Sequence, residues 1–155
     1  MGLELIPAYG RQEEIVTLFT EYTNMLMEAD PTVRQYLILQ HYEKELERPE
    51  SKYGMPEGRL YLAYWDGQLA GCIGLRKLDE KRGELKRLYV RPDFRGHRIG
   101  EQMIRRILTL AYESALSRLC TKSSVKIETT PFSSGISTSA IGSVAKSEII
   151  SVITT

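Results

Sequence analysis

The sequence predicts an α/β (α+β) fold in which a mostly antiparallel central sheet is flanked by helices. The first observation is a series of three β-rich runs in the middle of the chain, of which the first two are joined by Asp66-Gly67. An Asp-Gly pair tolerates the positive φ values of a type I′ turn, so it predicts a tight hairpin. The second observation is that apolar residues recur at three- and four-residue spacing before and after these runs, which is typical of helices with one buried face.

The N-terminal third of the chain predicts one strand and two helices. A short strand is expected at residues 3–9 and a helix at residues 12–28. Asp30-Pro31 breaks this helix and suits the first turn of the next one. The second helix begins at Val33 and becomes polar over residues 43–48, where we interpret the charges as a solvated face rather than a binding site.

The rest of the chain predicts the sheet, one long helix and a final strand. Pro, Gly, Ser and charged residues between Pro49 and Gly58 mark a surface loop. Three strands are expected after it, at residues 59–65, 68–78 and 84–90. They are followed by an amphipathic helix at residues 101–119 and by a strand at residues 125–132.

Length and composition agree with a single domain of residues 1–155, because a chain of this length can bury a core that needs no disulfide or metal. The net charge of +1 predicts no nucleic-acid surface. No apolar run approaches the ~20 residues that cross a membrane, so no membrane partner is expected. Cys72 and Cys120 lack a metal-ligand spacing, and we interpret them as reduced thiols of a cytoplasmic protein rather than as a disulfide or a reactive thiol.

The stretch from Glu84 to Gly100 predicts an anion-binding turn between a strand and a helix. Gly96 and Gly100 bound a short loop that enters the long helix. A helix N-terminus carries unpaired backbone N–H groups and about half a positive charge, so it attracts phosphate. Gly96 lets a phosphate approach the backbone closely, and Arg95 and Arg98 add positive charge.

Two common glycine-rich phosphate loops do not fit this stretch. The P-loop of nucleotide hydrolases requires G-x-x-x-x-G-K-[ST], and the stretch has neither that spacing nor the Lys-Ser/Thr pair. The dinucleotide-binding fingerprint requires three glycines, and only two are present.

The stretch resembles the acyl-CoA-binding motif of the GNAT superfamily of N-acetyltransferases, V-x-P-x-x-R-G-x-G-[IL]-G. Arg98 stands where glycine is commonest, and six positions match in register: Val90, Pro92, Arg95, Gly96, Ile99 and Gly100. The order of elements also resembles the GNAT fold, which has a mixed sheet whose fourth strand splays from the fifth. The resemblance implies an acetyl-CoA-dependent N-acetyltransferase that transfers an acetyl group directly to an amine of a small molecule or protein. It implies acetyl-CoA (coenzyme A) as cosubstrate and no metal.

The resemblance also implies where the cosubstrate binds. Pantetheine would pair with the backbone of Leu88, Tyr89 and Val90, and the Leu88 amide would polarise the thioester carbonyl. The pyrophosphate would be held by the loop made of Arg95, Gly96, His97, Arg98, Ile99 and Gly100.

Glu84 is the candidate general base, because several families of this superfamily place a glutamate at this point of the motif strand. The attacking amine must be neutral, so a carboxylate or an ordered water has to accept its proton. The alternative is that Glu84 faces Lys86 or Arg87 in solvent at the edge of the strand. We expect His97 to be a loop residue beside phosphate rather than the base.

Residues 133–155 depart from the family pattern. Relatives carry here a tyrosine that serves as general acid, and alignment on Gly142 places Thr138, whose hydroxyl is far less acidic, at that position. The segment is interpreted as a divergent but ordered end, as a segment that pairs with a second subunit in a homodimer, or as an altered reading of the gene. A second function therefore stays open, that of a catalytically weak acyl-CoA-binding module with a sensing or assembly role.

The acceptor amine is not identified by any cluster of residues. Five residues on the first two helices either line a cationic acceptor site or are ordinary core and surface residues: Tyr22, Glu28, Asp30, Tyr36 and Tyr42.

Overall fold

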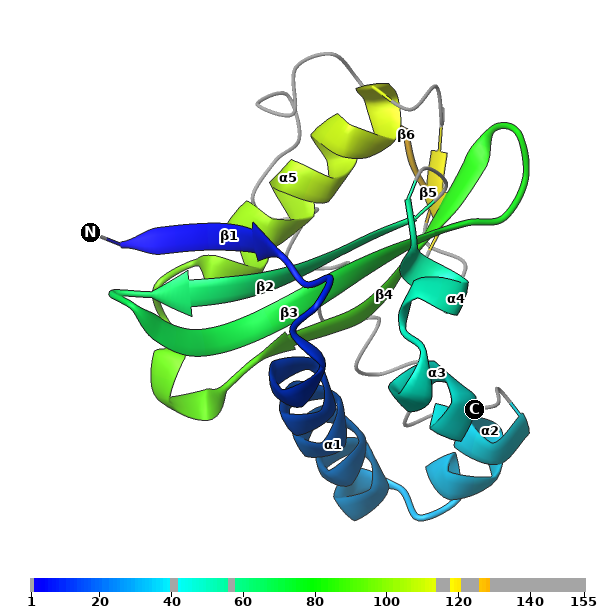
Figure 1. Ribbon diagram of the computed structural model, residues 1–155, viewed down its shortest axis with the longest axis vertical. Coiled ribbons are helices and arrows are strands. Elements are labelled where there is room, and N and C mark those ends of the chain that lie inside the picture. Colours follow the sequence, from blue (N-terminus) through cyan, green and yellow to red (C-terminus); the bar gives the residue numbers. More distant parts are fainter. Residues whose placement is uncertain (1, 40–41, 56–57, 114–117, 121–125, 129–155) are drawn as a thin grey trace.

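A computed structural model of the chain describes residues 2–39, 42–55, 58–113, 118–120 and 126–128. Within these residues the strands form one sheet in sequential order (Figure 1). Neighbouring strands are antiparallel except β4 and β5, which are parallel, so the predicted mixed, mostly antiparallel sheet is confirmed. The strands are β1 (Leu3–Pro7), β2 (Arg59–Trp65), β3 (Gln68–Lys77), β4 (Arg82–Val90), β5 (Arg118–Cys120) and β6 (Lys126–Glu128).

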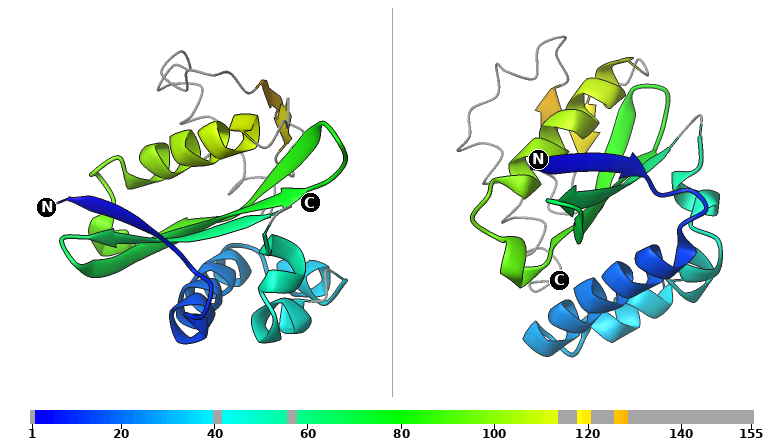
Figure 2. Two further views of the ribbon diagram at one scale, coloured as in Figure 1. Left: turned by 45° about the horizontal axis from the view of Figure 1, so that its top comes forward. Right: turned by 60° about the vertical axis from the view of Figure 1, so that its left-hand side comes forward.

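The helices cover both faces of the sheet (Figures 1 and 2). One face carries α5 (Ile99–Glu113). The other face carries α1 (Gln12–Ala29), α2 (Val33–Leu39), α3 (Tyr42–Glu47) and α4 (Glu50–Tyr53). No described helix is long and apolar enough to span a membrane.

Strand β4 contributes to an apolar cluster on each face. Leu85 and Leu88 pack with Met103 of α5, whereas Tyr89 packs with Tyr22 of α1 on the opposite face. Leu88 and Tyr89 face opposite ways because side chains alternate along a strand, whereas Leu85 and Leu88 share a face because β4 has one extra residue between Lys86 and Tyr89. Burial of each such side chain contributes about 1.5–3 kcal/mol, so the two clusters fix β4 between α1 and α5.

The predicted hairpin and the helix that follows the glycine loop are both present. Asp66 and Gly67 have φ values of 49° and 81°, the positive values that a type I′ turn needs. The observed β2 has the predicted bounds, and β3 ends one residue earlier than expected. Helix α5 begins at Ile99, two residues earlier than expected, so Ile99 and Gly100 of the predicted loop lie in its first turn.

The expected helix over residues 101–119 is wrong at its C-terminal end. The helix ends at Glu113, and Arg118–Cys120 forms β5, which pairs with the start of β4. Helical spacing of apolar residues continues through this stretch, but pairing with β4 decides its conformation. The strand expected at residues 125–132 is described only for Lys126–Glu128, which is β6. Thr138 and residues 133–155 lie outside the described part of the chain.

The interpretation of residues 43–58 needs two corrections. The expected surface loop contains α4, and its Tyr53 is wholly buried. The charge run expected to be solvated includes Glu45, which is only 1% exposed. Both side chains are buried by contacts with the sheet, which residue composition does not reveal.

Candidate functional site

The centre of the candidate site is the edge of β4 at residues 85–90, called the free edge below because no other described strand pairs with it. Among the described residues, β4 pairs with β5 through Arg82, Gly83 and Glu84. Beyond Glu84, β4 continues to Val90 beside β3, and no described strand pairs with residues 85–90 on the other edge. Backbone N–H and C=O groups along such an edge can pair with an extended ligand.

A β-bulge lies in the middle of this free edge. Gly74 of β3 is opposite Lys86, and Cys72 is opposite Tyr89, so one residue of β3 faces two residues of β4. Arg87 is at the bulge with a φ of 57°, in the left-handed region that favours glycine. The extra residue makes Lys86 and Arg87 successive buried side chains.

Arg87 forms a buried ion pair with Glu45 of α3. The Nη2 atom donates to Oε2 at 2.6 Å and Nε donates to Oε1 at 3.1 Å. The Tyr53 hydroxyl also donates to Glu45, and Lys52 Nζ lies 3.6 Å from its Oε2. Burial raises the pKa of Glu45, but the Arg87 charge and these hydrogen bonds outweigh burial and hold the pKa below its ordinary value. The sequence did not suggest this pair, because its two members are far apart in the chain.

Glu84 lies beside Lys86, as the alternative interpretation of this residue expected. Its Oε1 is 3.4 Å from Lys86 Nζ, and the two side chains are 18% and 8% exposed. The pair is therefore not in open solvent. Burial, and next the Arg87 charge, lower the pKa of Lys86 from 10.5 to about 8. The role of Glu84 as a base stays a prediction.

Lys86→Met is expected to raise the free energy of unfolding near neutral pH by about 1–3 kcal/mol, because burial of the ammonium opposes folding. The folded pKa of about 8 lies below the unfolded value, so this penalty is complete below pH 8 and fades as the pH rises toward 10.5. Urea unfolding of wild type and variant across this range should show the two stabilities converging. If the stability difference between wild type and variant were the same at every pH, the pKa of Lys86 would not be lowered in the folded protein.

The loop between β4 and α5 contains a short helical turn and two residues with a left-handed backbone. Pro92–Phe94 forms a 3₁₀ turn, and Gly96 and Arg98 have φ values of 95° and 59°. The left-handed backbone at Arg98 explains why glycine is commonest there. The Arg95 Nε atom donates to the Val90 carbonyl at 3.0 Å, so this arginine lies over the end of the free edge.

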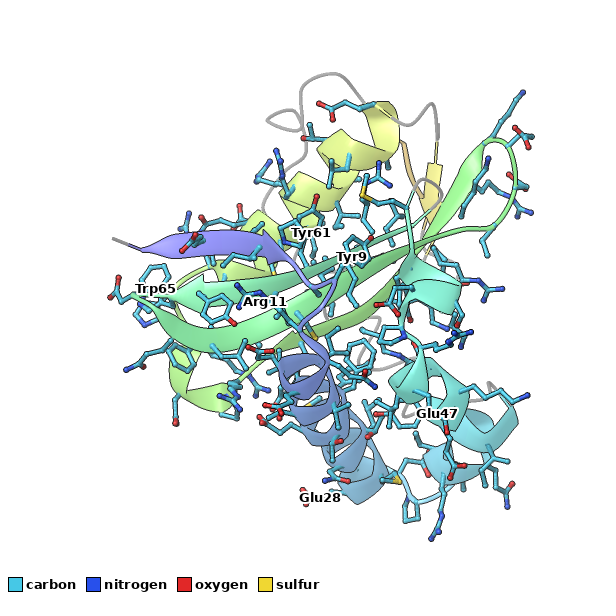
Figure 3. The ribbon with its side chains drawn as sticks, viewed as in Figure 1. Tyr9, Arg11, Glu28, Glu47, Tyr61 and Trp65 are labelled. Carbon is cyan, nitrogen blue, oxygen red and sulfur yellow. The ribbon has the colours of Figure 1, made fainter. Side chains whose placement is uncertain are left out.

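The structure adds Trp65 to the surroundings of the loop. Its ring stacks on His97, with ring centroids 4.6 Å apart and planes inclined by 22°. Trp65 ends β2, at the hairpin tip (Figure 3). His97 is an exposed loop residue that Trp65 contacts from the sheet, and its place beside phosphate stays a prediction. The sequence carried no signal for this contact between distant residues.

A second ion pair fastens the end of β4 to α1. Arg91 Nη2 donates to Glu21 Oε2 at 2.7 Å, and its Nε donates to Oε1 at 3.0 Å. The Tyr89 hydroxyl donates to the same carboxylate at 3.3 Å. These contacts hold α1 beside the free edge.

A pocket of about 320 Å³ lies between α1, α2 and α3. Arg34 and Lys44 on its wall form no ion pair with another described residue. The Tyr42 ring connects the pocket to the bulge, because the Arg87 guanidinium lies 5.5 Å from its centroid. The pocket is lined by Thr23, Met27, Arg34, Ile38, Tyr42, Glu43 and Lys44.

The expected cationic acceptor site is not assembled by the described side chains. Of the residues considered, Tyr42 lines the pocket and Tyr22 is buried in the core. The Asp30 carboxylate accepts hydrogen bonds from the backbone N–H and hydroxyl of Thr32. Glu28 is exposed at the far end of α1 (Figure 3). The side chain of Tyr36 lies outside the described part.

No group of three or more His, Cys, Asp or Glu side chains suited to a metal occurs among the described residues. Cys72 is a buried free thiol, and the side chain of Cys120 is not among those described.

A family model described as the acetyltransferase (GNAT) family matches residues 15–126. The matched stretch contains the free edge of β4, the loop and α5. Uncharacterized N-acetyltransferase YedL of Escherichia coli is 32% identical over 111 residues, which cover 66% of this chain and 68% of that protein. An uncharacterized N-acetyltransferase of Dictyostelium discoideum is 36% identical over 87 residues, which cover 56% of this chain and 37% of that protein. The chain thus spans about a third of one relative and two thirds of the other.

Solved acetyltransferases share the fold. One from Streptococcus agalactiae has a TM-score of 0.63 at 21% identity, covering 78% of this chain and 73% of that one. A GNAT family acetyltransferase from Elizabethkingia anophelis with acetyl-CoA bound has a TM-score of 0.52 at 22% identity, covering 77% and 64%. The PaiA N-acetyltransferase from Thermoplasma acidophilum in complex with coenzyme A has a TM-score of 0.58 at 17% identity, covering 78% and 79%.

Proposed function

We propose that this chain, which belongs to the acetyltransferase (GNAT) family, binds acetyl-CoA along the free edge of β4 and transfers the acetyl group to an amine. The observation that carries the proposal is the continuity of two features. Residues 85–90 have an edge with no described strand partner, and this edge leads directly into the loop at the N-terminus of α5. Two similar folds hold acetyl-CoA or coenzyme A, which supports the same cosubstrate here.

In this proposal the pantetheine arm pairs with the backbone of residues 88–90 as an added strand. The pyrophosphate lies against the backbone N–H groups between Arg95 and Gly100, where the dipole of α5 favours negative charge. Arg95 has to release the Val90 carbonyl when pantetheine pairs with it, and the guanidinium is then free to contact phosphate.

The reaction proposed is direct transfer. A neutral amine attacks the carbonyl carbon of the thioester, the C–N bond forms and the C–S bond breaks. The Leu88 N–H stabilises the charge that develops on the carbonyl oxygen. Glu84 accepts the proton of the amine, directly or through a water, and CoA leaves as the thiolate.

The pocket between α1, α2 and α3 is the candidate entry for the acceptor. Its charged lining residues Arg34, Lys44 and Glu43 sum to +1, which suits an amine that also carries a carboxylate or another anion. Its volume falls in the range of small-molecule sites. The pocket therefore favours amino-acid-like acceptors over polyamines.

The test is a panel of amines with CoA release and product mass as readouts. We expect turnover with amines that carry an anionic group, and a KM for the acceptor that rises several-fold in Arg34→Gln. Arg48→Gln is the matched control, because Arg48 is also exposed but does not line the pocket. Equal turnover of polyamines, or equal effects of both variants, would contradict this acceptor class.

A second candidate is a catalytically weak acyl-CoA-binding module, favoured by Thr138 at the position of the family's tyrosine. It predicts acetyl-CoA binding without acetylation of any amine on the panel. Repeated turnover with any one amine, measured as acetylated product in excess of the enzyme, would exclude this second candidate.

A further inference from the structure

We propose that Glu45 and Cys72 are positioning residues that jointly orient the peptide group between Arg87 and Leu88, and so aim the Leu88 N–H at the thioester carbonyl. The inference deepens the proposed function and rests on it. Its basis is the way in which the bulge of β4 is held from two sides.

The backbone at Arg87 is in a conformation that an arginine does not adopt by preference. Its φ of 57° lies in the left-handed region, which is strained for a residue with a side chain. Such a conformation persists only where the surroundings impose it. The bulge alone does not require arginine, since glycine would adopt the same φ without cost.

The side chain of Arg87 is held at its tip by the helical layer. Its two hydrogen bonds to Glu45 measure 2.6 Å and 3.1 Å, and the residues are 5% and 1% exposed. Tyr53 donates to the same carboxylate, which fixes its orientation. A bidentate pair of this kind sets direction as well as distance, so α3 determines where the Arg87 side chain points.

The other side of the bulge is held by Cys72 of β3. Its buried Sγ lies 3.3 Å from the Arg87 carbonyl oxygen and donates to it. The Arg87 C=O and the Leu88 N–H belong to one planar trans peptide group, in which they point in opposite directions. Because the carbonyl points toward β3, the Leu88 N–H points away from β3, toward the free edge of β4.

The two contacts together therefore determine the direction of one N–H group. Loss of either contact lets the peptide group rotate, which weakens polarisation of a bound thioester. Binding of acetyl-CoA depends mainly on the loop of residues 95–100 and should change little. We therefore expect the polarisation of the bound thioester carbonyl to change while the affinity for acetyl-CoA stays nearly the same.

The experiment measures the infrared band of the thioester carbonyl, using acetyl-CoA labelled with carbon-13 at that carbon, together with the Kd from calorimetry. In the wild type, binding should shift the band to lower frequency. Arg87→Lys, which cannot form the bidentate pair, and Cys72→Ala, which lacks the donor, should each lose at least half of this shift. Their Kd should stay within about threefold, and CoA release with an accepted amine should slow by about 10–100-fold.

Two controls separate orientation from general loss of stability. Cys72→Ser keeps a donor and should retain most of the shift. Ile73→Val removes one buried methyl group from the core on the opposite face of the sheet and should retain all of the shift. An unchanged band in Arg87→Lys and Cys72→Ala, with acetyl-CoA bound, would overturn this proposal alone. Failure of the wild type to bind acetyl-CoA would overturn it together with the proposed function.

Discussion

Glu45→Gln is expected to lower the free energy of unfolding by about 3–5 kcal/mol, because it leaves the Arg87 charge buried without its counter-charge. The wild-type pair has two short hydrogen bonds in a region shielded from water. Glu47→Gln is the matched control on the same helix, where the side chain is exposed (Figure 3), and it should change stability by less than about 0.5 kcal/mol. Urea unfolding measures both.

The pH dependence gives a second check on the same pair. The pKa of Glu45 in the folded state is below its ordinary value, so its stabilising contribution is present above the unfolded pKa and is lost as the pH falls through the folded one. Glu45→Gln should therefore remove part of the acid-induced loss of stability that the wild type shows. If Glu45→Gln and Glu47→Gln behave alike at all pH values, the buried ion pair does not stabilise the fold.

Glu84→Gln is expected to slow acetyl transfer by about 10²–10⁴-fold, the usual contribution of a positioned general base. The Kd for acetyl-CoA should change little, because the loop at α5 is unaltered. Steady-state kinetics with an accepted amine, together with a titration of acetyl-CoA, measure these effects.

Glu80→Gln is the matched control for this prediction. Glu80 is an exposed glutamate in the turn before β4, where it forms only a surface ion pair with Lys77. The Glu80→Gln variant should keep the rate of acetyl transfer and the pH profile of the wild type. A Glu84→Gln variant with the same rate and pH profile as the wild type would show that another group, or water, accepts the proton.

Local sequence patterns predicted the turn and the loop, because the backbone conformation of each depends mainly on residues that are adjacent in the chain. Asp66-Gly67 specified its hairpin because few residue pairs adopt two successive positive φ values. The loop before α5 was recognisable because glycine and arginine are placed where a helix begins. These features placed the strand that ends at Val90 shortly before a loop and a helix, as the structure has them.

Contacts between distant segments could not be predicted in the same way. Glu45 stands in a charge run that has the composition of a solvated surface, and only the approach of α3 to the bulge gives it a buried partner. The stacking of His97 on Trp65 depends on where the hairpin tip meets the loop. The short strand β5 follows from pairing with β4 rather than from its own residues.

Calorimetric titration of the protein with acetyl-CoA, free CoA and ATP tests the cosubstrate site directly. Saturable one-to-one binding of acetyl-CoA and CoA is expected, and no binding of ATP. Arg95→Ala should abolish the binding of acetyl-CoA, whereas Arg106→Ala, at an exposed position of α5 outside the loop, should preserve it. Absence of acetyl-CoA binding, or equal binding of ATP, would contradict the assignment of the free edge of β4 and its loop as the cosubstrate site.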